Sequence, residues 1–205
     1  MKSEWNKLDN AAKIFPAAQS KKDTQVFRFS CELYKTVNKD LLQKATEDTL
    51  EEFDIFKSIL RRGLFWYYLE ESDIKPIVRE EYKIPCSLIY QRNNHKLLFE
   101  VTYYRNRINL EVFHVLTDGT GAMNFLKTLV SNYLTLAENV EDSGVDYDAS
   151  STQKSDDSFS KYYSGKISSK QENNPVAYKI VGQKYPDDKL KVINGMVDVK
   201  KVLEE

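Results

Sequence analysis

Several short segments are rich in apolar residues, and in some of them apolar and polar positions alternate. This pattern predicts strands that bury one face. They cover residues 25–34, 55–60, 64–69, 84–90, 96–104 and 108–114. In the last of these runs Ile108, Leu110 and Val112 are predicted to point inward, and Asn109 and Glu111 outward. Counting by two places His114 on the inward face at the end of this strand.

Two segments instead repeat apolar residues every three or four positions, which predicts amphipathic helices. Asn38 is the predicted N-cap of the first helix, because its side chain can accept hydrogen bonds from the free amides of the first turn. This helix should reach Glu52 with a buried stripe of Leu42, Ala45, Thr49 and Phe53. The second helix follows a Gly-rich turn at residues 122–137. The pattern predicts an α+β fold, with a mixed, largely antiparallel sheet and both helices on one face.

Glycine, proline and polar runs predict where the chain turns. Arg61, Arg62 and Gly63 separate two aromatic runs and predict a hairpin. Pro16 predicts a break after Phe15 in the lead-in segment, because proline disfavours a helical conformation in its predecessor.

Composition divides the chain into three parts. A structured N-terminal unit is predicted at 1–137, followed at 138–175 by an acidic, Ser-rich linker with almost no aliphatic residues. Strands are predicted again at 176–181 and 189–197, and Asp198 is placed to cap a short final helix. The last part, 176–205, would begin a second structural half.

The overall composition is that of a globular protein, with 41% hydrophobic and 12% aromatic residues. A net charge of -1 gives no field that would attract nucleic acid or an anionic membrane. No run approaches the ~18 apolar residues of a membrane span, and without an apolar leader the expected compartment is the cytoplasm. Cys31 and Cys86 lack the spacing of a zinc site, so two reduced thiols and no metal are expected.

Two histidines, His95 and His114, are the residues best suited to act as a general base near neutral pH. His95 has no acidic or cysteine partner at motif spacing and is predicted to lie on the surface. His114 precedes Asp118 and Gly119 at a strand-to-helix turn, a combination expected by chance in roughly one case in 300. The plainer alternative is a helix N-terminus capped by Asp118 or Thr120, with His114 hydrogen-bonded in the core.

The stretch from His114 to Gly119 resembles the HxxxDG motif of a superfamily. Its members are chloramphenicol acetyltransferase, the condensation domains of peptide synthetases and the plant acyltransferases. Residues 8–13, 61–69 and the helix after the motif are similar to bacterial alcohol acetyltransferase-like proteins. The resemblance runs along nearly all of the chain but covers only the N-terminal half of the family's usual length. It implies one half of a two-layer sandwich like that of chloramphenicol acetyltransferase.

The resemblance implies that His114 is a general base. It would deprotonate an alcohol or amine acceptor, which then attacks the thioester of an acyl-CoA or of a carrier-bound acyl group. General-base catalysis typically contributes about 10² to 10⁴-fold. Acyl-CoA, for instance acetyl-CoA, would be a co-substrate, and neither a tightly bound cofactor nor a covalent acyl-enzyme is implied.

In the family the aspartate of the motif pairs with a basic residue and braces the loop, so Asp118 and Gly119 would have structural roles. The family's arginine aligns near Lys57 on the predicted hairpin. Lysine lacks the bidentate fork of arginine, and the alternatives left open are Arg28, Arg61 and Arg62.

The family's second half carries a DFGWG-like motif and much of the CoA-facing wall, and the motif does not occur in this sequence. The chain alone is therefore expected to be inactive and to need the missing half or another subunit; association into a homo-oligomer stays open. Phe113 replaces a histidine usual in condensation domains, which favours an acetyltransferase-like protein. The alternatives are a condensation-type domain that forms amides or esters, and a non-catalytic scaffold that binds a carrier protein or another partner.

Overall fold

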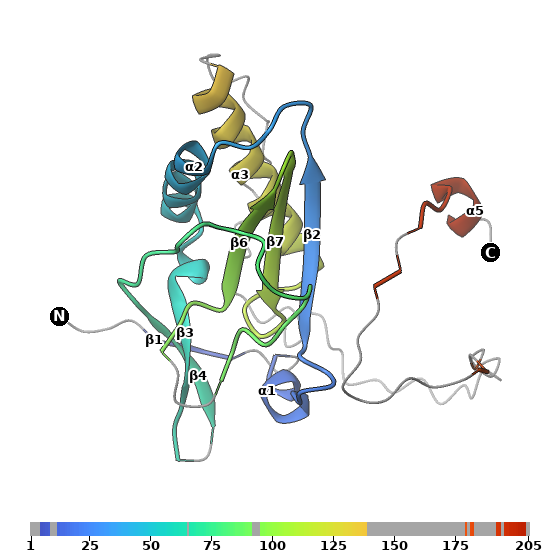
Figure 1. Cartoon of the computed structure of the whole chain (residues 1–205). Coiled ribbons are helices and arrows are strands. Elements are labelled where there is room, and N and C mark those ends of the chain that lie inside the picture. Colours follow the sequence, from blue (N-terminus) through green and yellow to red (C-terminus); the bar gives the residue numbers. More distant parts are fainter. Residues whose placement is uncertain are drawn as a thin grey trace. The chain divides into compact units, whose positions relative to one another are not determined.

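A four-stranded sheet in the order β2-β7-β6-β5 contains the strand that leads to His114 (Figure 1). Its members are β2 (Val26–Glu32), β5 (Arg79–Glu80), β6 (Phe99–Tyr104) and β7 (Arg107–Phe113). β7 is antiparallel to both of its neighbours, β2 and β6, whereas β5 pairs with β6 in parallel. The predicted mixed, largely antiparallel sheet is therefore confirmed.

The computed structural model describes residues 5–8, 12–64, 66–91, 95–138, 179, 181–182, 192–193 and 195–203. The chain divides into two units, Met1–Gly165 and Lys166–Glu205. The predicted linker lies outside the described residues from position 139 to its end at 175.

The described helix of the second unit is α5 (Val199–Leu203), and the predicted cap is confirmed. The Asp198 carboxylate accepts a 2.9 Å hydrogen bond from the amide of Lys200. Of the strand predicted at 189–197, the described residues 192–193 and 195–197 are exposed and have no regular structure. The strand prediction is wrong for these five positions, where the apolar side chains have no neighbouring strand in the described part of the unit.

A second, antiparallel sheet has the order β1-β4-β3 and consists of β1 (Trp5–Lys7), β3 (Ser58–Arg62) and β4 (Tyr67–Glu71). β3 and β4 form the predicted hairpin, whose turn is closed by a 2.7 Å hydrogen bond from the Gly63 amide to the Trp66 carbonyl. This second sheet accompanies the predicted mixed sheet. The predicted strand at 55–60 is too long, because Asp54–Lys57 forms a 3-10 helix, η1.

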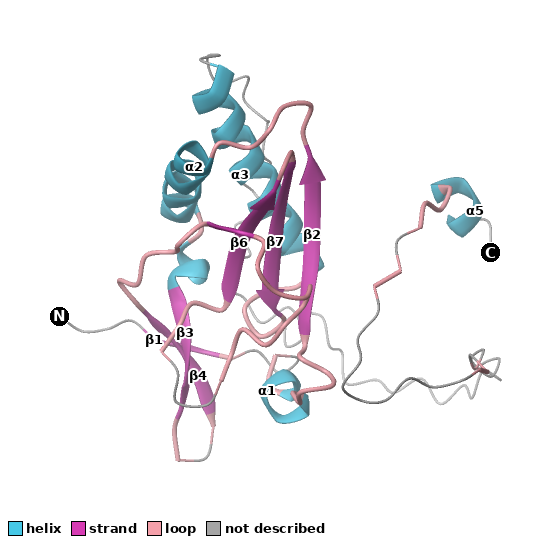
Figure 2. Ribbon diagram, viewed as in Figure 1, coloured by secondary structure: helices cyan, strands magenta, loops and turns pink. Residues whose placement is uncertain are grey.

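Two long helices, α2 (Lys39–Glu52) and α3 (Gly119–Glu138), pack against each other, and α3 also contacts β2 and β7 (Figure 2). α2 begins as predicted, with the Asn38 side chain accepting hydrogen bonds from the amides of Asp40 and Leu41 at 2.9 and 3.2 Å. The core contains the predicted stripe of α2 and the inward residues of β7: Leu42, Ala45, Thr49, Phe53, Ile108, Leu110 and Val112. In the described part of the chain no helix has the length and hydropathy needed to cross a membrane.

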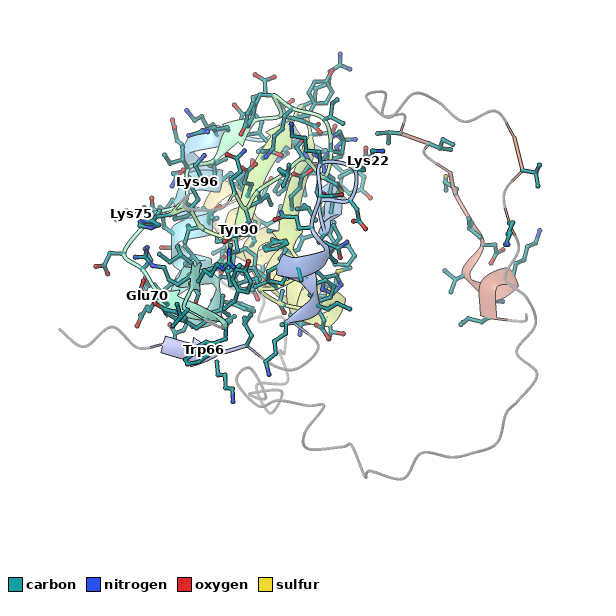
Figure 3. All side chains as sticks on the ribbon, turned by 90° about the horizontal axis from the view of Figure 1, so that it is seen from below. Lys22, Trp66, Glu70, Lys75, Tyr90 and Lys96 are labelled. Carbon is teal, nitrogen blue, oxygen red and sulfur yellow. The ribbon has the colours of Figure 1, made fainter. Side chains whose placement is uncertain are left out.

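The other face of the four-stranded sheet is covered as well. Asn109 and Glu111, predicted to face outward, are only 0% and 2% exposed. Residues 81–91, here called the strap, lie over them: the amide of Cys86 donates a 2.6 Å hydrogen bond to Glu111, and Tyr90 stacks on Phe113 (Tyr90 is labelled in Figure 3). A strand predicted at 84–90 is absent from these described residues.

Two neighbouring residues explain why the strap is irregular. Pro85 has no amide hydrogen to donate to a strand ladder, and Cys86 has a φ of 58°, which is incompatible with an extended strand. The Glu81 amide still donates a 2.8 Å hydrogen bond to the Tyr103 carbonyl of β6, but beyond it the contacts given above between the strap and the sheet involve side chains and not strand pairing.

The lead-in segment forms a short helix, α1 (Ile14–Ala18), where a chain break was predicted. Pro16 is its third residue, and in the first turn of a helix an amide has no partner within the helix, so its loss costs little. Figure 1 shows α1 at the end of the sheet where β2 begins and β7 ends. This is also the end at which His114 lies.

Candidate active site around His114

His114 begins the turn that joins β7 to α3. Its amide donates a 2.9 Å hydrogen bond to the carbonyl of Gln25, just before β2, and the amide of Leu116 donates one of 2.9 Å to the carbonyl of Phe113. The backbone at His114 is thus attached to the edge strand on one side and to β7 on the other. A side chain placed on such a rigid strand end can be positioned accurately.

The imidazole of His114 is half-buried between two aromatic rings. Phe15 of α1 stacks on it almost flat, with ring centroids 4.3 Å apart and an interplanar angle of 11°. Phe27 of β2 approaches at 4.9 Å and 58°. Phe27 pairs with Val112, so the ring contacts the sheet on the predicted inward side. Among the described residues, neither ring nitrogen of His114 has a hydrogen-bond partner, which differs from the plainer alternative of a hydrogen-bonded core histidine.

Asp118 caps α3. Its carboxylate accepts a 2.8 Å hydrogen bond from the amide of Gly121, and its carbonyl accepts one of 3.1 Å from the amide of Ala122. At Gly121 a β-carbon would lie 2.0 Å from the hydroxyl oxygen of Thr117, whereas at Gly119 its nearest contact would be an ordinary 3.8 Å to Phe29. Of the two glycines, Gly121 is therefore the one at which a side chain would displace the Thr117 hydroxyl.

The four predicted basic partners of Asp118 are all engaged elsewhere. Lys57 pairs with Asp54 at 3.1 Å and Glu51 at 3.3 Å, Arg61 with Glu70 and His95, Arg28 with Glu81 and Glu111, and Arg62 lies over the Tyr67 ring. None of these four residues forms an ion pair with Asp118. The predicted brace is corrected to a helix cap, because each basic side chain has a carboxylate or an aromatic ring closer at hand.

Removing the Asp118 cap should destabilise the chain in a way that distinguishes a cap from an ion pair. Asp118→Ala should lower the free energy of unfolding by about 1 kcal/mol, whereas Asp118→Asn should cost less than half as much, because its amide oxygen can still accept from Gly121. Urea unfolding of both variants measures the difference. Equal losses for the two substitutions would contradict the cap and favour a charge-dependent brace.

A charge network around the buried carboxylate of Glu111 joins the strap to the sheet. Arg28 of β2 and Glu111 of β7 are cross-strand partners joined at 2.7 Å, and Glu81 of the strap pairs with both Arg28 and Arg107. Burial opposes the charge of Glu81, but hydrogen bonds and charges from Arg28 and Arg107 outweigh it, so the net effect lowers the pKa of this carboxyl. The network attaches the strap to the sheet electrostatically.

Among the described residues there is no metal-binding cluster, and both cysteines are free. No group of three or more His, Cys, Asp or Glu side chains there could hold a metal ion. Cys31 and Cys86 are free, half-buried thiols. Burial raises the pKa of both, and at Cys86 the charge of Glu111 adds to it. Neither thiol is therefore activated as a nucleophile.

The sequence did not reveal the aromatic contacts of His114. In the sequence, Phe15 stands out only as the residue before a proline, and Phe27 is one apolar position of the strand predicted at 25–34. The network of Arg28 and Glu111 did have a signal, because both residues occupy the outward face of strands that become neighbours. Recognising it would have required the β2–β7 register, which places residues 83 positions apart side by side.

Together, the sheets, the two long helices and the histidine turn between β7 and α3 have a fold similar to part of a condensation domain. No family model and no curated protein matches the sequence. The starter condensation domain of rhizomide synthetase RzmA has a TM-score of 0.57 at 12% identity, over 71% of this chain and 41% of that domain. A variant of the same domain in complex with C8-CoA also has a TM-score of 0.57, at 11% identity over 70% of this chain and 38% of the other.

The first condensation domain of the calcium-dependent antibiotic synthetase, in complex with a substrate analogue, is similar too. Its TM-score is 0.52 at 14% identity, over 70% of this chain and 40% of that domain. The chain thus spans about two fifths of the length of these domains. These neighbours support the fold that the resemblance implied, and they are condensation domains, not the alcohol acetyltransferase-like proteins to which residues 8–13 and 61–69 were compared.

Proposed function

We propose that this chain carries the histidine-bearing half of an acyl-transfer site of the acyltransferase or condensation type. The observation that supports it most directly is the placement of His114. It lies at a strand-to-helix turn of a condensation-domain fold, and no described residue engages its ring nitrogens. A neutral imidazole in that setting can accept a proton from an acceptor alcohol or amine.

The reaction follows from this placement. As the acceptor oxygen or nitrogen attacks the thioester carbonyl, a C–O or C–N bond forms and the C–S bond breaks. The proton of the acceptor passes to His114 and from there to the departing thiolate, so that the products are an ester or amide and a free thiol. The lone pair of the accepting nitrogen lies in the plane of the imidazole, so the proton is transferred at the ring edge, which the flat stack of Phe15 on the ring face does not cover.

The donor is proposed to be an acyl-CoA, supported by the C8-CoA complex of a structural neighbour. Within this class acetyl-CoA is the narrower proposal for the donor, and a carrier-bound acyl group is the alternative. For the acceptor, an alcohol is proposed first. The chain spans about two fifths of the length of such domains. The second wall of the site is therefore proposed to come from a further half or from another subunit, and without it this chain is proposed to be inactive.

The test is a thiol-release assay on the complete gene product that contains these residues. We expect free CoA to appear from C8-CoA or acetyl-CoA only when an alcohol or an amine is added, and a mass-balanced ester or amide to form with it. Release of CoA with an alcohol indicates ester formation, and release with an amine indicates amide formation. No release from CoA or carrier thioesters with either acceptor would contradict the proposal and favour the non-catalytic scaffold.

A further inference from the structure

Helix α1 is attached to the histidine turn at two points. None of its five residues is buried, and of these Phe15 is the one that packs against the hydrophobic core, with its ring flat on the imidazole of His114 at 4.3 Å. Ile14, its neighbour, is 63% exposed. The contact between α1 and the catalytic candidate is therefore concentrated in one side chain.

The second attachment is a hydrogen bond at the end of the helix. The side-chain amide of Gln19 donates to the carbonyl of Tyr90 at 3.2 Å and to that of Thr24 at 3.4 Å. Tyr90 in turn stacks on Phe113, the residue before His114, with centroids 5.6 Å apart and an angle of 4°. α1 is thus in direct contact with the His114 ring and, through Gln19 and Tyr90, is linked indirectly to Phe113.

The flat stack has a consequence for how the imidazole can rotate. The outer torsion of a histidine side chain is broad, so an unrestrained ring samples many orientations. Rotation about that torsion would drive the edge of the His114 ring into Phe15, while Phe27 limits movement toward β2. Aromatic pairs of this kind change populations by about 2- to 12-fold, and a general base needs its ring held within about 10–20° of the productive orientation.

We infer that Phe15 is a positioning residue that holds the His114 imidazole in one orientation, with α1 as the element that presents it. In this inference Phe15 acts on the reaction through the base and not through the substrate. The inference gains its catalytic meaning from the proposed function, but the orientation itself can be measured without any turnover.

The structural test uses proton NMR of the full 205-residue chain, which has two histidines, His95 and His114. We expect the ring protons of His114 to be shifted upfield by Phe15, and Phe15→Leu to remove that shift. Phe15→Tyr, which keeps a flat ring, should retain it, as should Ile14→Ala on the same helix. His95→Gln assigns the two sets of signals. Unchanged His114 signals in Phe15→Leu, or an equal change in Ile14→Ala, would overturn the inference.

Folding is monitored through the His95 signals and far-UV circular dichroism. Gln19→Ala provides a second route should Phe15→Leu fail to fold, because it releases α1 without altering either ring. We expect it to move the His114 signals in the same direction by a smaller amount. If Phe15→Leu is unfolded and the His114 signals do not move in a folded Gln19→Ala chain, the inference is also contradicted.

The catalytic test separates positioning from a structural role. In the complete gene product, Phe15→Leu should lower kcat for acyl transfer by about 2- to 12-fold with KM for acyl-CoA unchanged, and Phe15→Tyr should restore kcat. An unchanged kcat alongside altered His114 signals would overturn the catalytic role. Absence of transfer in the unmodified protein would instead refute the proposed function, while the NMR result would still decide whether Phe15 orients His114.

Discussion

His114→Ala should reduce acyl transfer by the complete gene product by about 10² to 10⁴-fold. The substitution removes the only described side chain at this turn that can take a proton from the acceptor near neutral pH. Because the base acts on the acceptor and does not bind the thioester, the loss should fall on kcat, with KM for acyl-CoA changed little. The thiol-release assay, run with a saturating alcohol or amine, measures both parameters.

The matched control is His95→Ala. His95 is exposed and contacts Arg61 beside the β3–β4 hairpin, away from the turn after β7, so its removal should leave transfer unchanged. Circular dichroism of His114→Ala checks that loss of the contacts to Phe15 and Phe27 has not unfolded the chain. Transfer by a folded His114→Ala protein at more than one third of the normal rate would contradict the assignment.

Arg28→Met should destabilise the fold by about 3–5 kcal/mol, because it leaves the carboxylate of Glu111 buried without its cation. Glu111 is only 2% exposed, and apart from Arg28 it is held by the amide of Cys86. Adding Glu111→Gln should recover a large part of the loss, because the remaining partner is then uncharged and can still accept from Cys86. Urea unfolding at neutral pH measures each variant.

Arg62→Met is the control for this series. Arg62 is exposed on the hairpin and lies 5.8 Å from the centre of the Tyr67 ring, so the change in unfolding free energy should stay within about 0.5 kcal/mol. Two results would contradict a charge network around the buried Glu111 carboxylate. One is a loss of unfolding free energy in Arg28→Met as small as that in Arg62→Met. The other is a double variant that is less stable than Arg28→Met alone.

Acid should weaken the same network. Since the pKa of Glu81 is lowered in the folded chain from its usual 4.5, the stability that its ion pairs contribute is present above pH 4.5 and is lost as pH falls through the folded pKa. Arg28→Met removes one of the two cations that lower this pKa, so this component of the acid dependence should shrink. Unfolding curves at neutral pH and below pH 4 compare the two proteins.

Several elements could be predicted because their signals are local. The cap of α2 involves Asn38 and amides two and three residues later, and the cap of α5 has the same form at Asp198. The hairpin around Gly63 and the inward alternation of β7 likewise depend on neighbours within a few positions. Periodicity and capping preferences are properties of short segments, so they can be recognised in a single sequence.

The failures have an equally physical cause. The strap was predicted as a strand because its residues are apolar and β-like, but Pro85 and the backbone at Cys86 prevent regular pairing. Asn109 and Glu111 were predicted to face outward because alternation shows only that two faces exist, and not what covers the second one. Asp118 was assigned an ion pair by resemblance, whereas its own turn uses the carboxylate as a cap.

For the candidate site, the sequence by itself determined the local unit: a strand, a histidine, a tight turn and a helix, in an order that resembles a catalytic motif. Only the tertiary structure decided what surrounds that histidine. His114 is contacted by Phe15, Phe27 and the Gln25 carbonyl, which lie about 90 to 100 positions earlier in the chain. Such contacts are selected by the packing of whole elements, and no short-range preference in the sequence encodes them.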